Sequence, residues 1–250
     1  MRTLLIVTGG SAGLGRGLIA TAPAGSHRVD VSRSGPPPEA DAHLGLDLAV
    51  PANWPTLRSA FDALFAAEPW DRITVVHSAG TLHPIGFAGE VDAAAYETSA
   101  LLGSVAGQII GDHVLSSAAA GTRLELVMIT SGAARSVYPG WSAYGAGKAA
   151  LDQWVRIVGA EQRQRAEERG HRPAKVLAIA PGIVATDMQA TIRDTDQQAF
   201  PEVERFRRLH DEGQLTEPHD AARGIWDVLD DPGVRTGSVV DLRDRAGAGS

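Results

Sequence analysis

Cysteine is absent from this sequence of 250 residues. Its absence excludes disulfide scaffolds, thiolate nucleophiles, iron–sulfur clusters and zinc sites that use cysteine ligands. Basic residues are fewer than acidic ones: the sequence has 23 Lys and Arg and 30 Asp and Glu, which gives a formal net charge of −7. Such a charge gives no electrostatic basis for binding nucleic acid or an anionic membrane. We therefore expect small molecules as partners, with no nucleic acid and no membrane.

Long apolar runs and metal-binding motifs are lacking as well. The N-terminal apolar run stops at Gly9, far short of a signal-peptide core or a membrane span, which predicts a cytoplasmic protein. The eight histidines form no H-E-x-x-H pattern or comparable ligand spacing, so we expect no metal site.

Two kinds of segment alternate along the chain. Short β-branched or aliphatic runs predict buried strands at 4–7, 29–31, 44–46, 73–76, 124–129, 176–179 and 239–242. Longer Ala-rich stretches predict helices at roughly 14–21, 55–67, 92–117, 142–169 and 218–230. This alternation predicts an α/β Rossmann fold, a doubly wound parallel sheet of about seven strands with helices on both faces.

The domain organisation is predicted to be simple. The chain has no internal repeat and no linker that would divide it, so residues 1–250 are expected to form one domain. One long segment without strand character, 183–217, lies between the sixth strand and the last helix. A segment of that size beside a sheet edge is typical of a substrate loop or lid.

A glycine-rich segment, TGGSAGLG at 8–15, follows the first strand directly and opens the first helix. Such a loop brings backbone N–H groups and a helix N-terminus up to a pyrophosphate. Side chains at the tight positions would block that approach, which accounts for Gly9, Gly13 and Gly15. We predict that these glycines, with Ser11 and Leu14, bind a dinucleotide; a glycine-rich turn without a ligand is the alternative.

The end of the second strand indicates which dinucleotide is bound. An acidic residue at the position of Ser32 would favour NAD, but here a small hydroxyl is followed by Arg33. A guanidinium binds a 2′-phosphate bidentately, so Arg33 favours NADP(H) over NAD(H), although a solvated surface cation is the alternative. Asp47 and Leu48, after the third strand, are placed to contact the adenine.

Three further residues indicate catalysis. Tyr144 and Lys148 lie four residues apart, a spacing that places both side chains on one face of a helix. Ser131 comes thirteen residues before Tyr144, just after a predicted strand. The carboxyl end of a strand is where an open α/β sheet builds its ligand crevice, so we expect the three side chains opposite the glycine loop.

These motifs, in this order, resemble the short-chain dehydrogenase/reductase family over essentially the whole chain. The matching segments are TGGSAGLG at 8–15, Asp47-Leu48, Ala79-Gly80, Ser131, Tyr144 with Lys148, and 181–186. The resemblance implies that Ala79, Gly80, Pro181, Gly182, Val184 and Thr186 also bind the cofactor. The segment Thr186 to Gln189, with Phe206, Gly213 and Pro218, resembles the benzil reductase and sepiapterin reductase-like branch.

The resemblance implies a carbonyl reductase that uses NADPH. Tyr144 would protonate the carbonyl oxygen of a ketone or diketone, Lys148 would favour the phenolate and hold the nicotinamide ribose, and Ser131 would bind the substrate oxygen. A 3-oxoacyl or polyketide reductase and an alcohol dehydrogenase are alternatives within the family. A non-catalytic NADP(H)-binding sensor or scaffold is the alternative outside catalysis. The family also implies a homodimer or homotetramer, through the helices at 92–117 and 142–169.

The sequence departs from the family at two asparagines. The usual Asn-Asn-Ala-Gly is His77-Ser78-Ala79-Gly80 here, and no Asn occurs near 99–101, where a helix asparagine is expected. We therefore expect an altered proton relay behind Lys148. Tyr138 and Trp141, close to Tyr144, are interpreted as packing or subunit-contact residues.

Overall fold

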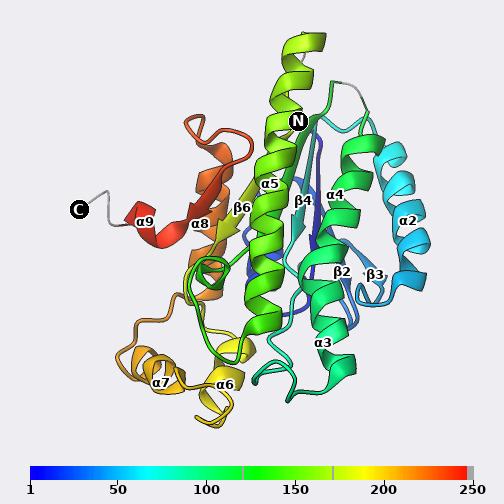
Figure 1. The fold of residues 1–250 in the computed structure, drawn as a ribbon. Coiled ribbons are helices and arrows are strands. Elements are labelled where there is room, and N and C mark those ends of the chain that lie inside the picture. The colour runs from blue at the N-terminus through cyan, green and yellow to red at the C-terminus, as the bar shows by residue number, and fades with distance from the viewer. Residues whose placement is uncertain (120, 171, 247–250) are drawn as a thin grey trace.

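The computed structural model describes residues 1–119, 121–170 and 172–246. Over these residues seven strands form one sheet in the order β3-β2-β1-β4-β5-β6-β7, with every neighbouring pair parallel (Figure 1). The strands are β1 Thr3–Thr8, β2 Ser26–Ser32, β3 Ala42–Gly45, β4 Arg72–His77, β5 Arg123–Ile129, β6 Lys175–Ala180 and β7 Val239–Asp241. The strand order reverses between β1 and β4, and this switch point is where such sheets bind ligands. The predicted Rossmann fold is confirmed.

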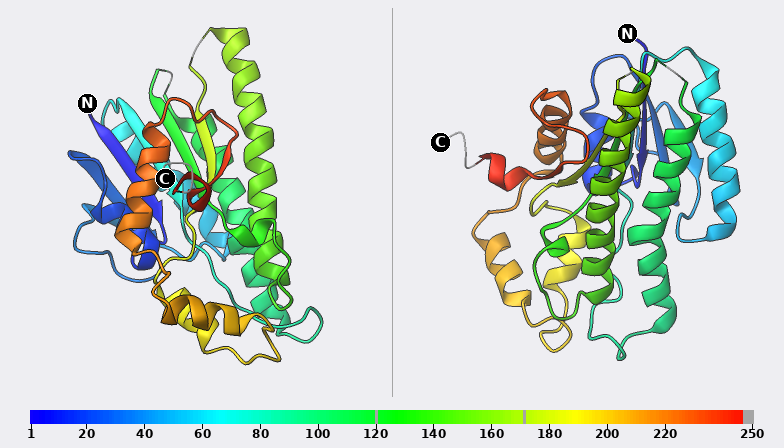
Figure 2. Two further views of the ribbon diagram at one scale, coloured as in Figure 1. Left: turned by 90° about the vertical axis from the view of Figure 1, so that its left-hand side faces the viewer. Right: turned by 45° about the horizontal axis from the view of Figure 1, so that its top comes forward.

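Helices cover both faces of the sheet (Figure 2). Helices α2, α4 and α5 pack on one face, and α1 and α8 pack on the other. The helices are α1 Gly13–Ala20, α2 Trp54–Ala67, α3 Ala93–Ala100, α4 Ala106–Ser117, α5 Ser142–Arg169, α6 Asp187–Arg193, α7 Val203–Asp211, α8 Pro218–Asp230 and α9 Leu242–Ala246. Short single turns are η1 Pro51–Asn53, η2 Leu101–Val105 and η3 Gly132–Ala134.

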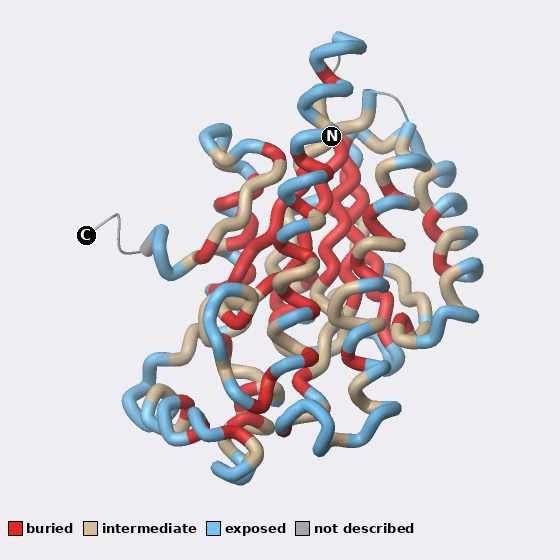
Figure 3. Tube along the Cα trace, viewed as in Figure 1, coloured by how far each residue is buried: buried red, intermediate tan, exposed pale blue. Residues whose placement is uncertain are grey.

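The core explains why the strands are apolar throughout. Successive side chains of a strand point to opposite faces, so Leu4 and Ile6 pack under α2 and α4 while Leu5 and Val7 pack under α1 and α8. Figure 3 shows the buried residues concentrated along the strands, with the outer faces of the helices exposed. The central strands therefore form a rigid platform whose carboxyl ends position the loops.

The helix predicted over 92–117 is present but is not regular α-helix at its middle. The structure has α3, then a π-helical turn, η2, and then α4. The backbones of η2 and α5 approach closely here, since a Cβ on Gly147 would lie 3.2 Å from the carbonyl carbon and oxygen of Gly103. The turn lies at this contact with another helix, which periodicity along one segment does not reveal. Such π turns are frequent at functional sites.

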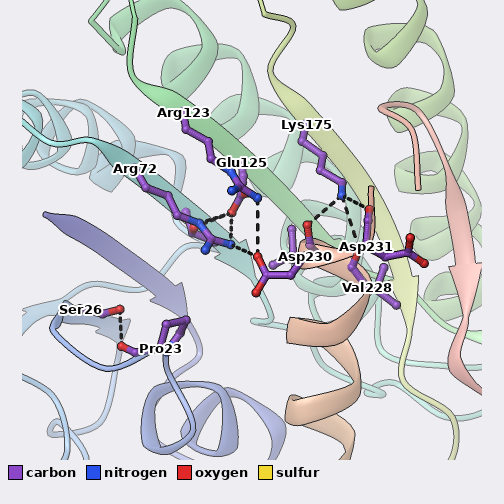
Figure 4. A network of polar contacts seen from close by, with 11 residues as sticks. Pro23, Ser26, Arg72, Arg123, Glu125, Lys175, Val228, Asp230 and Asp231 are labelled. Atoms are coloured by element: carbon purple, nitrogen blue, oxygen red, sulfur yellow. Dashed lines mark hydrogen bonds and ion pairs between the residues drawn. The ribbon is translucent and has the colours of Figure 1, made fainter. Parts of the chain in front are cut away.

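A buried ionic network lies at the amino-terminal edge of the sheet (Figure 4). The fully buried carboxylate of Glu125 pairs with Arg72 and Arg123, at 2.7 Å in each case. Arg72 also pairs with Asp230 at the end of α8, at 3.2 Å. Lys175 donates to the carbonyls of Leu229 and Asp231, at 2.8 and 2.9 Å, and so caps the C-terminus of the same helix. The network fixes α8 on the sheet, at the edge opposite the carboxyl ends of the strands.

Candidate active site

One large cavity opens at the carboxyl ends of the strands. Its volume of about 780 Å³ is in the range of cofactor and small-molecule sites. Every residue that the sequence predicts for catalysis or cofactor binding lines this cavity. These residues are Gly9, Ser11, Gly13, Leu14, Gly15, Arg33, Asp47, Leu48, Ala79, Gly80, Ser131, Tyr144, Lys148, Pro181, Gly182, Val184 and Thr186.

The glycine loop forms one wall of the cavity and has no room for side chains. Gly9 has a φ of +71°, in the left-handed region that favours glycine. A Cβ on Gly15 would lie 2.0 Å from the carbonyl oxygen of Gly9, which is a severe clash with backbone. No side chain caps the N-terminus of α1, so its first N–H groups are left for a ligand. The loop therefore has the form of a cradle for an anionic group.

Arg33 stands at the mouth of the cavity, at the end that β2 and β3 form. Its side chain is 74% exposed, and its Nη1 atom lies 3.8 Å from Oδ2 of Asp47. The hydroxyl of Ser32 points inward instead, 2.7 Å from a carboxylate oxygen of the buried Asp30. Arg33 therefore supplies a positive charge at this end of the cavity, and it can bind a phosphate without breaking a tight ion pair.

Ser131 and Tyr144 both line the cavity, and Ser131 lies near enough to affect the pKa of Tyr144. Ser131 follows β5 and caps η3, with its Oγ accepting from the N–H of Ala133 at 3.2 Å. Burial raises the pKa of Tyr144 above its usual 10.0, and Ser131 opposes that shift. The phenol consequently keeps its proton at neutral pH.

Lys148 lies one helical turn beyond Tyr144 on α5, and its Nζ atom is 5.8 Å from the centre of the Tyr144 ring. The ammonium donates to the carbonyl of Ile129 at 2.8 Å. Burial lowers the pKa of Lys148 from 10.5 to about 8, while the charge of Asp152 opposes the shift. Lys148 is therefore mostly charged at neutral pH and lies close to the ring of Tyr144.

His77 occupies the position of a family asparagine, at the end of β4. Its ring is fully buried, with Nδ1 2.9 Å from Oγ1 of Thr8 and with Nε2 lacking a hydrogen-bond partner. Burial, followed by the charge of Lys148, lowers the pKa of His77 from 6.5 to about 3, and the Leu102 carbonyl opposes the shift. The ring is therefore neutral at ordinary pH. A neutral imidazole therefore stands where the family has an asparagine, and the proton relay expected behind Lys148 stays a prediction.

An aromatic cluster closes the other end of the cavity. Trp141 stacks on Phe200, with ring centres 4.4 Å apart and planes at 11°. Its ring also makes an edge-to-face contact with Tyr144, with ring centres 5.6 Å apart. Tyr138 and Phe206 complete the cluster. Tyr138 and Trp141 pack as predicted, but both also line the cavity, which the sequence interpretation missed. Their positions six and three residues before Tyr144 are the signal that could have indicated this.

The segment 183–217 contributes further lining residues to which the sequence analysis assigned no role in the site. Helices α6 and α7 lie together beyond the carboxyl ends of the strands (Figure 1). They supply Met188, Gln189 and Ile192 from α6 and Arg205 and Phe206 from α7, all along the cavity. Before burial is known, a polar residue such as Gln189 looks the same as any surface glutamine.

Residues 1–119, 121–170 and 172–246 contain no group of three or more His, Asp or Glu side chains arranged to hold a metal ion. Within the same ranges, no helix is both long and apolar enough to cross a membrane.

Comparisons with known proteins agree with this geometry. The sequence profile for short chain dehydrogenases matches residues 3–197. A benzil reductase ((S)-benzoin forming) of Bacillus subtilis is 30% identical over 96% of this chain and 98% of its own length. A sepiapterin reductase of Rattus norvegicus is 28% identical over 79% of this chain and 73% of its own. In structure, a short chain dehydrogenase/reductase of Saccharomyces cerevisiae superposes with a TM-score of 0.80 at 23% identity, covering 98% of this chain and 97% of that one. This last match shows a likeness of fold.

Proposed function

Since the chain belongs to the short-chain dehydrogenase/reductase family, and is therefore an oxidoreductase acting on carbonyl or hydroxyl groups, we propose that it is an NADPH-dependent carbonyl reductase. One observation carries the proposal. Ser131, Tyr144 and Lys148 line the same cavity as a glycine loop whose backbone would clash with any side chain at Gly15.

The residues of the cavity fit a nicotinamide dinucleotide. The loop from Gly9 to Gly15 and the uncapped start of α1 form a cradle for the pyrophosphate. Arg33 would bind the 2′-phosphate, Asp47 and Leu48 the adenine, and Val184 with Thr186 the carboxamide of the nicotinamide. When bound, the cofactor supplies the hydride.

The protein's own part in the reaction is to hold and move one proton. Tyr144, kept neutral by burial, donates its phenolic proton to the substrate oxygen. Ser131 donates a hydrogen bond to the same oxygen and stabilises the negative charge that develops there. The charge of Lys148 stabilises the phenolate left behind, because its Nζ lies 5.8 Å from the ring. General acid catalysis of this kind contributes about 10²–10⁴-fold in rate.

The substrate we propose is an aromatic 1,2-diketone or a related ketone. The end of the cavity next to Tyr144 is lined by Tyr138, Trp141 and Phe206, and such surfaces favour aromatic groups. The Bacillus subtilis relative is named for reducing benzil. The segment 183–217 acts as the substrate loop, and residues 1–250 act as one dinucleotide-binding domain.

The direct test follows NADPH consumption with a panel of aromatic diketones, monoketones and 3-oxoacyl esters. We expect turnover with benzil. Replacing Tyr144 with Phe should reduce kcat by at least about 10²-fold while NADPH binds with unchanged affinity. Tyr96→Phe, on α3 and away from the cavity lining, is the matched control. Tight NADPH binding without turnover of any carbonyl would instead support a sensor.

Cofactor preference is tested separately. Arg33→Ala should weaken NADPH binding by about 10-fold or more and leave NADH binding unchanged, since only NADPH carries the 2′-phosphate. Arg16→Ala is the control, because Arg16 is also exposed and near the glycine loop but does not line the cavity. Equal losses for both cofactors would refute the role given to Arg33.

A further inference from the structure

Gln189 lines the wall of the cavity, and its buried side-chain amide has no hydrogen-bond partner. Only 3% of the residue is exposed, and neither Oε1 nor Nε2 of its amide has a hydrogen-bond partner. A buried polar group left without a partner destabilises a protein substantially, and native proteins rarely tolerate one without a reason. Because Gln189 lines the cavity, a bound molecule can supply the missing partner.

Trp141 presents a second group of the same kind. Its indole Nε1 is buried without a partner, although its ring is tightly packed against Phe200. Buried indole N–H groups usually find an acceptor. The ring is held next to Tyr144, at 5.6 Å between centres, and Trp141 also lines the cavity. The ring that carries this unpaired N–H therefore lies beside the ring of the proposed proton donor.

Both groups lie at the substrate end of the cavity. On α6, Gln189 is flanked by Met188 and Ile192, and both of these neighbours pack in the aromatic cluster that contains Trp141. The proposed cofactor contacts Val184 and Thr186, by contrast, precede this helix. Residues 188, 189 and 192 fall on one side of a helix of 3.6 residues per turn, so the amide shares the face that the cluster covers.

We propose that Gln189 and Trp141 recognise a second oxygen atom of the substrate, on the carbon next to the reacting carbonyl. This inference rests on the proposed function and specifies its substrate class as vicinal dicarbonyl compounds. Ser131 and Tyr144 bind the oxygen that is reduced. The amide N–H of Gln189 and the indole N–H of Trp141 donate to the neighbouring oxygen, which as a carbonyl has two lone pairs to accept them.

The test compares two substrates of the same shape. Benzil carries two adjacent carbonyls, whereas deoxybenzoin has the same two phenyl rings and only one carbonyl. Gln189→Met keeps the length of the side chain and removes the amide. We expect the ratio of kcat/KM for benzil over deoxybenzoin to fall by about 10- to 100-fold, with deoxybenzoin reduced as before. Trp141→Phe, which keeps an aromatic ring and removes the N–H, should lower the same ratio.

A charge variant tests the direction of the hydrogen bond. Gln189→Glu replaces the donor with a carboxylate that only accepts, so it should lower the benzil ratio further than Gln189→Met. NADPH affinity should be unchanged in all three variants. A loss of NADPH affinity, or equal losses for both ketones, would overturn the inference and leave the proposed function intact. Wild-type protein that reduces neither ketone would overturn both.

Folding gives a readout that does not depend on activity. Because the amide has no partner in the ligand-free protein, Gln189→Met should unfold at the same temperature as wild type or at a higher one. A lower unfolding temperature, or failure to fold, would mean that the amide stabilises the protein itself. That outcome would also overturn the inference.

Discussion

Replacing Lys148 with Met is expected to stabilise the cofactor-free protein at neutral pH, although it removes a proposed catalytic residue. Burial lowers the pKa of Lys148 from 10.5 to about 8. At about 1.4 kcal/mol per pKa unit, the buried charge costs about 3 kcal/mol of folding free energy. Methionine removes this cost but leaves the carbonyl of Ile129 without its donor, a loss of about 1 kcal/mol. The net gain of about 2 kcal/mol raises Tm by about 4–8 °C in a chain of this size.

The difference in unfolding free energy between Lys148→Met and wild type changes sign as the pH rises. The folded wild type releases the proton of Lys148 near pH 8, whereas the unfolded chain keeps it until about 10.5. Wild-type stability therefore rises through this window relative to the variant, by about 3 kcal/mol in total. Above the window the variant should be the less stable protein, by about 1 kcal/mol, because only the lost hydrogen bond to Ile129 remains.

Urea unfolding of both proteins at a series of pH values measures the difference directly. The chain has only two lysines, so NMR titration of the Lys148 side chain in a Lys175→Met background gives its pKa without overlap. Lys175→Met is also the control for stability. Its ammonium donates to the carbonyls of Leu229 and Asp231 at the end of α8, so this variant should be destabilised at neutral pH. A Lys148→Met protein that is less stable than wild type at every pH would refute the reasoning.

Three further outcomes follow from the same geometry. Gly15→Ala should weaken NADPH binding by more than about 10-fold in a fluorescence titration, because a Cβ at this position would lie 2.0 Å from backbone. Gly35→Ala is the control and should leave NADPH binding unchanged, because the space around Gly35 is open. His77→Asn should lessen the loss of stability in acid. The wild type loses about 2 kcal/mol of unfolding free energy between pH 6.5 and 5, because His77 is protonated in the unfolded chain but stays neutral in the folded protein down to about pH 3. Glu125→Gln should cost about 3–5 kcal/mol in chemical unfolding at neutral pH, because the buried guanidinium of Arg72 loses its buried carboxylate partner and keeps only the exposed Asp230. A cost below about 1 kcal/mol would contradict this account of the network.

Local sequence was sufficient for the sheet and for the glycine loop. The strands are continuous apolar runs because both faces of a parallel sheet are covered, and each run is visible without any other part of the chain. The positive φ of Gly9 and the lack of space for a Cβ at Gly15 also arise within one short segment. The spacing of Tyr144 and Lys148 follows from the helical repeat, so their common face was predictable as well.

Features that depend on contacts between distant segments were not predictable. The π turn exists where η2 meets α5, and Gly103 alone does not indicate it. Gln189 and the N–H of Trp141 became candidates only once both proved to be buried without partners. Burial and hydrogen bonding are properties of the folded arrangement, and a sequence pattern records them only where the partners lie close along the chain.

The turn η2 also constrains how the segment Leu101–Val105 can change during evolution. A π turn fits about five residues into the rotation and rise of four α-helical residues, so deleting one residue here would restore regular α-helix and leave α3 facing almost the same way. Inserting a residue would instead turn α3 by about 100°, and the side that now packs on α5 would face elsewhere. A one-residue deletion that keeps the close approach to Gly147 should therefore be tolerated more readily than an insertion.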